Sequence, residues 1–158
     1  MGLTYAPMKL IDYTQHQALL PALDAPGLHE AIRALADAMA ATDLVTDPEV
    51  LVADVLRREA AGSTAMPGGL VLPHAASEAA RAVTLGLATL SRPIEVLDDE
   101  GLPCPADVVV LLTAPPGQNR AMLWVLARLA RAIQGGLVQD LRDAHSAEAM
   151  AASLRDLP

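Results

Sequence analysis

The stretch "ADVVVLLTAPP", residues 106–116, gives the strongest strand signal in the chain. Its run of valine and leucine has the length of a strand, and the lack of polar alternation predicts burial on both faces of a sheet. Weaker strand patterns surround it along the chain. They comprise a short edge strand entering a loop at 17–27, strands at 69–73 and 82–90, and a hairpin at 94–104 that turns near "DDEG".

Helical patterns alternate with these strands. Residues 28–42 place apolar side chains at helical spacing, namely Leu28, Ile32, Leu35 and Met39. A second helix is expected to begin at Pro48, with Asp47 as its N-cap, and to stop at Gly62. A third helix is expected over about 119–134, with a buried face made of Met122, Leu126, Leu129 and Ile133.

Two short helices are expected to close the chain, the last of them capped by Ser146. The order of elements predicts an α/β fold, a single-domain sandwich over residues 1–158 in which helices flank a mixed β-sheet. Hydrophobic residues make up 53% of the chain, yet Phe is absent. Alanine, leucine and valine must therefore fill the core, which favours close packing of the helices on the sheet.

The charge and the cysteine content exclude several classes of function. The formal net charge is −8, which argues against nonspecific nucleic-acid binding because that requires clustered cations. Cys104 is the only cysteine, so no internal disulfide and no cysteine-based metal cluster can form. Residues 1–13 lack the pattern of a secretory signal, and no stretch approaches about eighteen uninterrupted apolar residues. We expect a cytoplasmic protein without direct membrane insertion.

Most of the polar motifs in the sequence do not match a known catalytic or ligand-binding pattern. Three of the four histidines, His16, His29 and His145, are expected to be solvated surface side chains. No two histidines have the spacing of a metal-ligand pair, which argues against a zinc site. The glycine-rich "GSTAMPGG", residues 62–69, lacks the lysine of a P-loop and the spacing of a dinucleotide-binding fingerprint. No serine lies in a G-x-S-x-G elbow, which argues against a serine hydrolase.

His74 differs from the other histidines by its position. The apolar run 70–72 and the rigid Pro73 lead directly to it, and the small residues 75–77 leave its imidazole accessible. Neutral imidazole, the nucleophilic form, is abundant near neutral pH. A single histidine at the end of a strand is nevertheless more often structural than catalytic, so the residues around it must decide.

Those residues form a motif. Within "VLRREAAGSTAMPGGLVLPHA", residues 55–75, its members are Leu56, Arg58, Glu59, Ser63, Thr64, Gly69, Pro73 and His74. The pattern resembles the signature of the fructose/mannitol-type IIA domains of the bacterial phosphoenolpyruvate:sugar phosphotransferase system, which include nitrogen-regulatory IIA proteins. The resemblance extends over about residues 18–155, because "DDEG", "ADVVVLLTAPPG", "MLWVLARLARAI" and "SAEAM" come in the family's order.

The resemblance implies a phosphohistidine carrier that serves sugar transport or, as signal transduction, nitrogen regulation. His74 would accept a phosphoryl group from an HPr-type protein, then pass it to a cysteine of a IIB domain or hold it as a regulatory mark. Because no IIB or membrane IIC domain is attached, we expect a regulatory role. Arg58 would neutralise the phosphoryl oxygens, and Thr64 would donate a hydroxyl hydrogen bond to them. Neither a metal nor an organic cofactor is implied.

Two positions depart from the family's pattern. Ala75 stands where glycine commonly follows the histidine, which would make the chain there stiffer. Met122 occupies the position of the family's second histidine, and a thioether cannot donate a hydrogen bond to phosphate. Two residues are candidates to compensate: Asn119, as an N-cap that turns free N–H groups toward the site, and Arg120 in the same first turn.

These departures leave other hypotheses open. The first is a IIA fold that binds a regulatory protein partner without phosphotransfer. Trp124 would be its anchor if it were exposed, although we expect this side chain to pack against a neighbouring helix. The second is an enzyme that uses His74 as a general base, for which no carboxylate or nucleophile is identifiable beside it.

Overall fold

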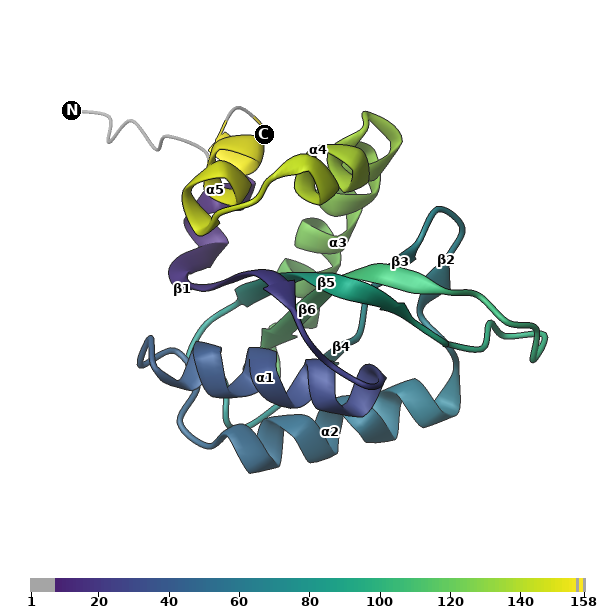
Figure 1. Ribbon diagram of the computed structural model, residues 1–158. Coiled ribbons are helices and arrows are strands. Elements are labelled where there is room, and N and C mark those ends of the chain that lie inside the picture. Colours follow the sequence, from purple (N-terminus) through teal and green to yellow (C-terminus); the bar gives the residue numbers. More distant parts are fainter. Residues whose placement is uncertain (1–7, 156, 158) are drawn as a thin grey trace.

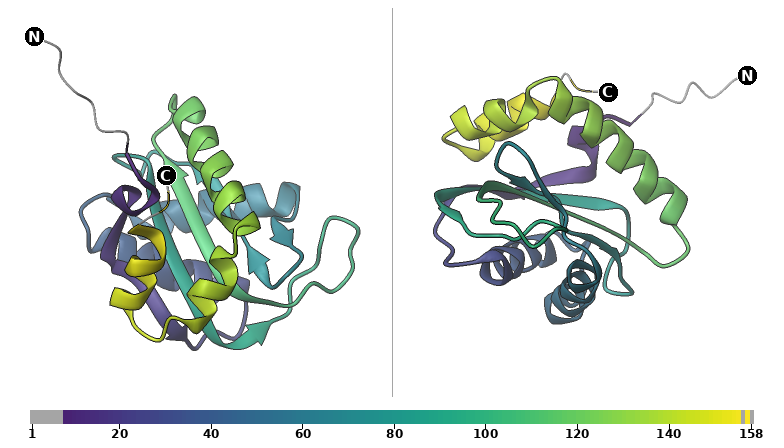
Figure 2. Two further views of the ribbon diagram at one scale, coloured as in Figure 1. Left: turned by 90° about the horizontal axis from the view of Figure 1, so that it is seen from above. Right: turned by 90° about the vertical axis from the view of Figure 1, so that its right-hand side faces the viewer.

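Helices cover both faces of a mixed sheet in the computed structural model, which describes residues 8–155 and 157 (Figure 1). The N-terminal stretch considered for a secretory signal lies mostly outside these residues. The helices on one face are α1 (Leu28–Ala40) and α2 (Pro48–Ala61), and those on the other are α3 (Asn119–Gln134), α4 (Leu137–Asp143) and α5 (Ala147–Arg155). Figure 2 shows the same layers from two further directions, and the predicted α/β sandwich is confirmed.

The sheet has the order β1-β5-β6-β3-β2, and β4 also pairs with β6. Its strands are β1 (Thr14–Leu23), β2 (Ala65–Met66), β3 (Leu70–Val71), β4 (His74–Ala76), β5 (Thr84–Ile94) and β6 (Ala106–Ala114). The β5–β6 pair is antiparallel, whereas β1 runs parallel to β5, and β3 and β4 run parallel to β6. β1 forms an edge, as predicted, and follows a short 3-10 helix at Leu10–Tyr13.

β6 explains why residues 106–116 show no polar alternation. Its side chains enter two cores in turn: Val108 and Val110 pack on the side of α3, α4 and α5, and Val109 and Leu111 on the side of α1 and α2. The predicted burial on both faces is therefore confirmed. Asp107 is the charged residue of this strand, and its carboxylate accepts hydrogen bonds from Arg142 of α4 at 2.7 and 2.8 Å.

The expected helix ends are confirmed where a cap marks them. Asp47 accepts two backbone hydrogen bonds from the first turn of α2, at 3.0 and 3.2 Å, and the helix ends at Gly62. Ser146 accepts a backbone hydrogen bond at 3.0 Å from the first turn of α5. Among the described helices, none is long and apolar enough by itself to cross a membrane; α3 and α4 meet those criteria only together, with a bend of 74° between them.

The face that α3 buries agrees with the prediction in part, since Met122 and Leu129 are buried as expected. Its buried residues are Met122, Val125, Leu129 and Ala132, while Leu126 and Ile133 are only half-buried. Small Val125 and Ala132 lie against the core and allow the helix to approach it closely, so the helix is turned relative to the stripe of larger side chains. Size alone therefore misled the assignment of the buried face.

The bounds of α3 confirm the predicted range of 119–134, but its N-cap is Gln118 and not Asn119, which is the first helical residue. Gly117, at φ +87°, lies in a turn that Gln118 closes by donating its N–H to Pro115 O at 3.2 Å. The residue before Asn119 is therefore the one at the helix boundary. No side chain caps this end of α3.

One hairpin of the structure was not predicted, and the predicted hairpin is less regular than expected. The glycine-rich segment 62–69 enters an unpredicted hairpin, in which β2 and β3 pair and Gly68 and Gly69 adopt φ of +97° and +92°. The hairpin expected at 94–104 has a single isolated bridge, between Leu97 and Pro103. The predicted turn near "DDEG" is present: Asp98 N donates to Leu102 O at 2.9 Å and Gly101 N to Asp98 O at 3.0 Å. The side chain of Asp98 accepts two further backbone hydrogen bonds at 2.9 Å.

Candidate functional site

His74 is the first residue of β4, beside the end of β6. Two backbone hydrogen bonds hold this short strand: Leu112 N donates to Pro73 O at 3.1 Å, and Ser77 N donates to Ala114 O at 2.9 Å. The imidazole itself is half-buried. His74 thus begins a second short strand after β3, on a backbone fixed on both sides by the central strand of the sheet.

One hydrogen bond determines the tautomer of His74. Its Nδ1 lies 2.7 Å from the carbonyl oxygen of Leu72. Because a carbonyl oxygen can only accept, Nδ1 carries the proton and donates it. Nε2 therefore keeps its lone pair and is the nitrogen that can act as a nucleophile.

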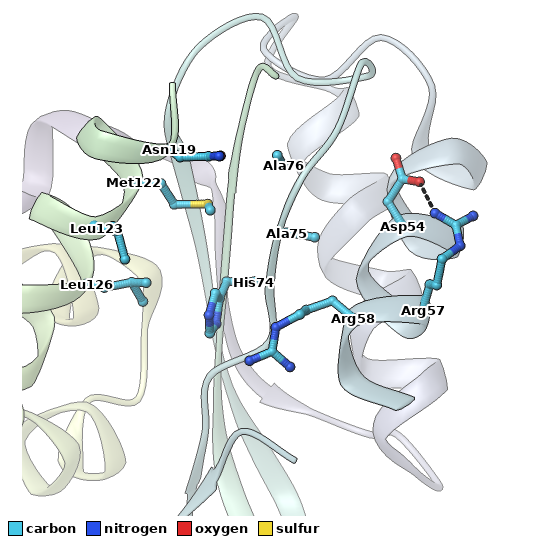
Figure 3. Close-up of a pocket in the computed structure, with 10 residues that line it drawn as sticks. All are labelled: Asp54, Arg57, Arg58, His74, Ala75, Ala76, Asn119, Met122, Leu123 and Leu126. Atoms are coloured by element: carbon cyan, nitrogen blue, oxygen red, sulfur yellow. Dashed lines mark hydrogen bonds and ion pairs between the residues drawn. The ribbon is translucent and has the colours of Figure 1, made fainter. Parts of the chain in front are cut away.

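A cavity of about 550 Å³ opens at His74 (Figure 3). Residues of α2 and β4 line one side, which we call the polar wall: Asp54, Arg57, Arg58 and His74. The exposed Arg58 extends from α2 toward His74, and its Nη1 donates to Gly62 O at 2.9 Å. Arg57 turns instead to Asp54, 2.9 Å away. The structure thus brings the predicted pair, Arg58 and His74, to one cavity.

Thr64 is placed differently. Its Oγ1 donates to Oε2 of Glu59 at 2.7 Å, and its backbone N–H donates to Oε1 of the same carboxylate at 2.9 Å. Thr64 is not among the described residues that line the His74 cavity. The threonine and glutamate of the motif tie the end of α2, which carries Arg58, to the segment leading into β2. Direct contact between Thr64 and phosphate stays a prediction.

The other side of the cavity, which we call the apolar wall, belongs to α3. Its residues are Asn119, Met122, Leu123 and Leu126. Met122 is only 9% exposed and its thioether brings no proton to the cavity. Arg120 lines a separate cavity beside Trp124. Of the two residues considered as compensation for Met122, only Asn119 reaches the cavity that contains His74.

Ala75 requires no special backbone in place of glycine. It pairs with Thr113 in the ladder between β4 and β6, and Thr113 Oγ1 donates to its carbonyl oxygen at 2.8 Å. The described non-glycine residues with positive φ are Ala22 and Asp43. Ala75 therefore has a backbone conformation that any residue adopts, and the alanine does not distort the site.

Trp124 contradicts the prediction that it packs against a helix, because its surface is 66% exposed. At about 100° per residue, position 124 lies about 200° around α3 from the buried Met122, and none of the helices within residues 8–155 buries it. Arg128 lies over the indole ring, with its guanidinium carbon 4.7 Å from the ring centroid. Leu123, beside it, is 62% exposed. The outward face of α3 therefore presents large apolar side chains to solvent.

Sequence reasoning missed Asp54, Arg57 and Leu123 as cavity residues. Asp54 lies four positions before Arg58, so the helical repeat places both on one face of α2 and could have indicated it. No comparable signal marked Leu123, because the expected buried face of α3 was turned. The other histidines, His16, His29 and His145, are exposed, as predicted. Within the described ranges, no three histidine, cysteine or acidic side chains gather as a metal site requires.

Comparisons with known proteins agree with the motif. The family model described as phosphoenolpyruvate-dependent sugar phosphotransferase system, EIIA 2, matches residues 13–156. The nitrogen regulatory protein of Bradyrhizobium diazoefficiens is 33% identical over 145 residues, which are 90% of this chain and 92% of that protein. The 2-O-alpha-mannosyl-D-glycerate-specific EIIABC component of Escherichia coli is 35% identical over 111 residues, which are 70% of this chain but 17% of that longer protein.

Solved structures share the fold at lower identity. Nitrogen regulatory protein IIA-Ntr from Neisseria meningitidis superposes with a TM-score of 0.79 at 18% identity, over 92% of this chain and 98% of that one. A chain of the complex of enzyme IIA-Mtl with phosphorylated enzyme IIB-Mtl from Escherichia coli gives 0.71 at 17% identity, over 87% and 94%. The family model and the 33% identical relative establish more than the fold: the chain belongs to the EIIA 2 family of the phosphoenolpyruvate-dependent sugar phosphotransferase system.

Proposed function

We propose that this protein is a phosphohistidine carrier that accepts a phosphoryl group on Nε2 of His74 from an HPr-type protein. The observation that carries the proposal is the hydrogen bond from His74 Nδ1 to Leu72 O, because it leaves Nε2 free in a cavity that also contains Arg58. Membership of the EIIA 2 family supports a phosphocarrier role.

The transfer step follows from these groups. The Nε2 lone pair of His74 attacks the phosphorus of the carrier's phosphohistidine, and the new N–P bond forms as the carrier's N–P bond breaks. The electron pair of the broken bond returns to the carrier's imidazole. The Nδ1 proton stays in its hydrogen bond to Leu72 O, which stabilises the positive charge that develops on the ring. Arg58 supplies a permanent positive charge for the phosphoryl oxygens, so the protein acts through position and electrostatics.

Two fates are open to the phosphoryl group. A cysteine thiolate of a IIB domain attacks the phosphorus, so that the S–P bond forms and the electron pair of the N–P bond returns to His74; or the group stays as a regulatory mark. Similarity to a nitrogen regulatory protein over 90% of the chain supports the regulatory use. A IIA chain of the same fold was solved with phosphorylated enzyme IIB, which supports a IIB domain as the other acceptor.

The test is an intact-mass measurement after incubation with phosphoenolpyruvate, Enzyme I and the cognate HPr-type carrier. We expect a single acid-labile phosphate on the parent protein and none on His74→Ala. His145→Ala, which removes an exposed histidine, is the matched control and should be phosphorylated like the parent. Equal phosphorylation of His74→Ala, or an unmodified parent beside a charged carrier, would contradict the proposal.

The exposed Trp124 favours a second candidate function, a module that binds a regulatory protein without phosphotransfer. Trp124 borders a cavity of about 550 Å³ that Arg120 also lines. α3 carries three arginines and no acidic residue, although the whole chain has a formal net charge of −8. Tryptophan and arginine are enriched where binding energy is concentrated. This face therefore suits an acidic partner that also presents apolar side chains.

Differential capture separates the two functions. If the second holds, an acidic protein is retained by the parent and by the control Leu97→Ala, which alters an exposed leucine far along the chain, but not by Trp124→Ala. Thermal stability should hardly change in either variant because both side chains are exposed. A phosphorylated parent whose bound proteins are unaffected by Trp124→Ala would exclude the second function.

A further inference from the structure

Asp54 holds a place in the cavity that the proposed transfer step does not use. Its Oδ2 accepts a hydrogen bond from the hydroxyl of Ser77 at 2.7 Å, and its Oδ1 accepts one from Arg57 at 2.9 Å. The two partners differ greatly in exposure: Ser77 is 2% exposed, whereas the side chain of Arg57 is 75% exposed. Only the bond to Ser77 is protected from water. We call it the Asp54–Ser77 link.

Ser77 is itself fixed to the sheet. Its N–H donates to Ala114 O, at the end of β6, at 2.9 Å. Its Oγ accepts the N–H of Ala79 at 3.2 Å while donating its proton to Asp54. The hydroxyl of Ser77 therefore both donates and accepts a hydrogen bond, and the backbone of Ser77 is bound to the central strand β6. A helix bound to Ser77 is bound to the frame that holds β4.

The Asp54–Ser77 link joins the two elements whose side chains must meet at a phosphoryl group. Asp54 lies one helical turn before Arg58 on α2, and Ser77 lies three residues after His74. Beyond Val55, α2 buries no side chain fully, and Leu56 packs against the core only in part, so polar bonds add to what holds the turn that carries Arg58. A short hydrogen bond to a carboxylate is stronger than one between neutral groups. It can therefore fix this part of the helix.

We infer that Asp54 is a positioning residue, which through Ser77 sets the distance between Arg58 and His74 for phosphoryl transfer. The inference rests on the proposed function of His74. Arg57 balances the negative charge of Asp54, so the link adds little repulsion toward an incoming phosphoryl group. A misplacement of about 1 Å between reacting groups can cost about 100-fold in rate, so a link of this kind affects the rate without touching the phosphate.

The experiment measures transfer from the phosphorylated HPr-type carrier over a range of carrier concentrations. We expect Asp54→Ala and Ser77→Ala each to lower the maximal transfer rate about 10-fold and to leave the apparent KM within about twofold. The double variant should be no slower than either single one, because one link is lost in each case. Asp54→Asn, which keeps an acceptor for Ser77, should restore most of the rate lost in Asp54→Ala.

Matched controls are Asp24→Ala, which removes an exposed carboxylate paired with Arg92, and Ser153→Ala, which removes a hydroxyl in α5. Both should transfer at the parental rate. Parental rates in Asp54→Ala and Ser77→Ala, or losses that multiply in the double variant, would overturn the inference. An unmodified parent would overturn the proposed function instead. In that case NMR signals of the His74 ring decide: they shift in Ser77→Ala if the link positions β4, and unchanged signals would disprove it.

Discussion

The two walls of the His74 cavity differ in what holds them and in what they offer. On the polar wall, each functional group is fixed by a hydrogen bond: His74 by Leu72 O, Asp54 by the Ser77 hydroxyl. The apolar wall is held by burial of one face of α3 in the core, and it also includes the exposed Leu123. Directional bonds set positions within tenths of an ångström, whereas apolar packing sets only shape and volume.

This difference assigns separate tasks to the walls. All side-chain charges of the cavity, among its described lining residues, lie on the polar wall, so in the proposed transfer the charge that develops on a phosphoryl group would be met from one side. In the same proposal, the apolar wall, which contains Met122, would offer surface to the phosphorylated carrier and exclude water from the reacting atoms. The predictions below test this division between electrostatics and docking.

The largest effect is expected for Arg58→Ala. The guanidinium extends toward His74 and is the free cation of the polar wall, since Arg57 is paired with Asp54. Loss of one group that stabilises developing charge typically costs about 100-fold in rate, so we expect a loss of that order in transfer from the carrier. Stability should hardly change, because Arg58 is exposed.

Arg58→Lys is the matched variant for this measurement. It keeps the charge but not the planar, forked donor set, and an intermediate rate is expected. A rate in Arg58→Ala within about twofold of the parental rate would show that another group meets the phosphoryl charge, and the polar wall would lose its assigned task.

Met122→His tests the apolar wall from the other direction. The substitution places a donor opposite His74 and should raise the transfer rate about 10-fold, within the range for a positioned acid or hydrogen-bond donor. Because position 122 is only 9% exposed, a polar ring there should lower the free energy of unfolding by about 1–3 kcal/mol, which urea denaturation would measure. Met122→Leu, which keeps an apolar side chain, should give neither effect. An unchanged rate in Met122→His would show that this side of the cavity does not face the transferring group.

The same contrast explains how far the sequence could predict the site. The caps Asp47 and Ser146 follow from local patterns, because a helix end requires particular residues within a few positions. His74 and Arg58 were assigned to the site through the resemblance of the motif at 55–75 to a known family. The uniform apolar run of β6 likewise specified burial on both faces. These features depend on residues that are close together in the chain, and so they can be predicted from the sequence.

The remaining features depend on residues distant in the chain or on competing geometry. The hydrogen bond between Asp54 and Ser77 joins residues 23 positions apart, and the sequence around neither residue predicts it. The buried face of α3 was set by how closely Ala132 can approach the core, which a stripe of larger residues concealed. Trp124 was expected to pack against a neighbouring helix, whereas its side chain is 66% exposed, and the spacing within α3 does not show which neighbours the folded chain supplies.

A smaller effect is expected for Thr64→Val. The threonine bonds twice to Glu59, so its loss should loosen the end of α2 and cost about 1–2 kcal/mol of unfolding free energy for the hydroxyl bond to a carboxylate. The transfer rate should fall only about threefold, because Arg58 moves slightly and remains charged. Glu59→Gln combined with Thr64→Val should cost less than the sum of the two, as residues in direct contact do. A loss of about 100-fold with unchanged stability would instead indicate direct contact between Thr64 and phosphate.

The smallest effect is expected for Leu123→Ser, which removes an exposed apolar side chain from the edge of the apolar wall. If this wall serves docking, the apparent KM for the phosphorylated carrier should rise about threefold, since a single exposed leucine contributes modestly to an interface, while the maximal rate stays the same. Leu102→Ser, at an exposed leucine in the 94–104 loop, is the control and should leave both values unchanged. A fall in the maximal rate at constant KM would mean that α3 takes part in the transfer itself, because only an interaction made in the transition state changes the rate without changing the affinity.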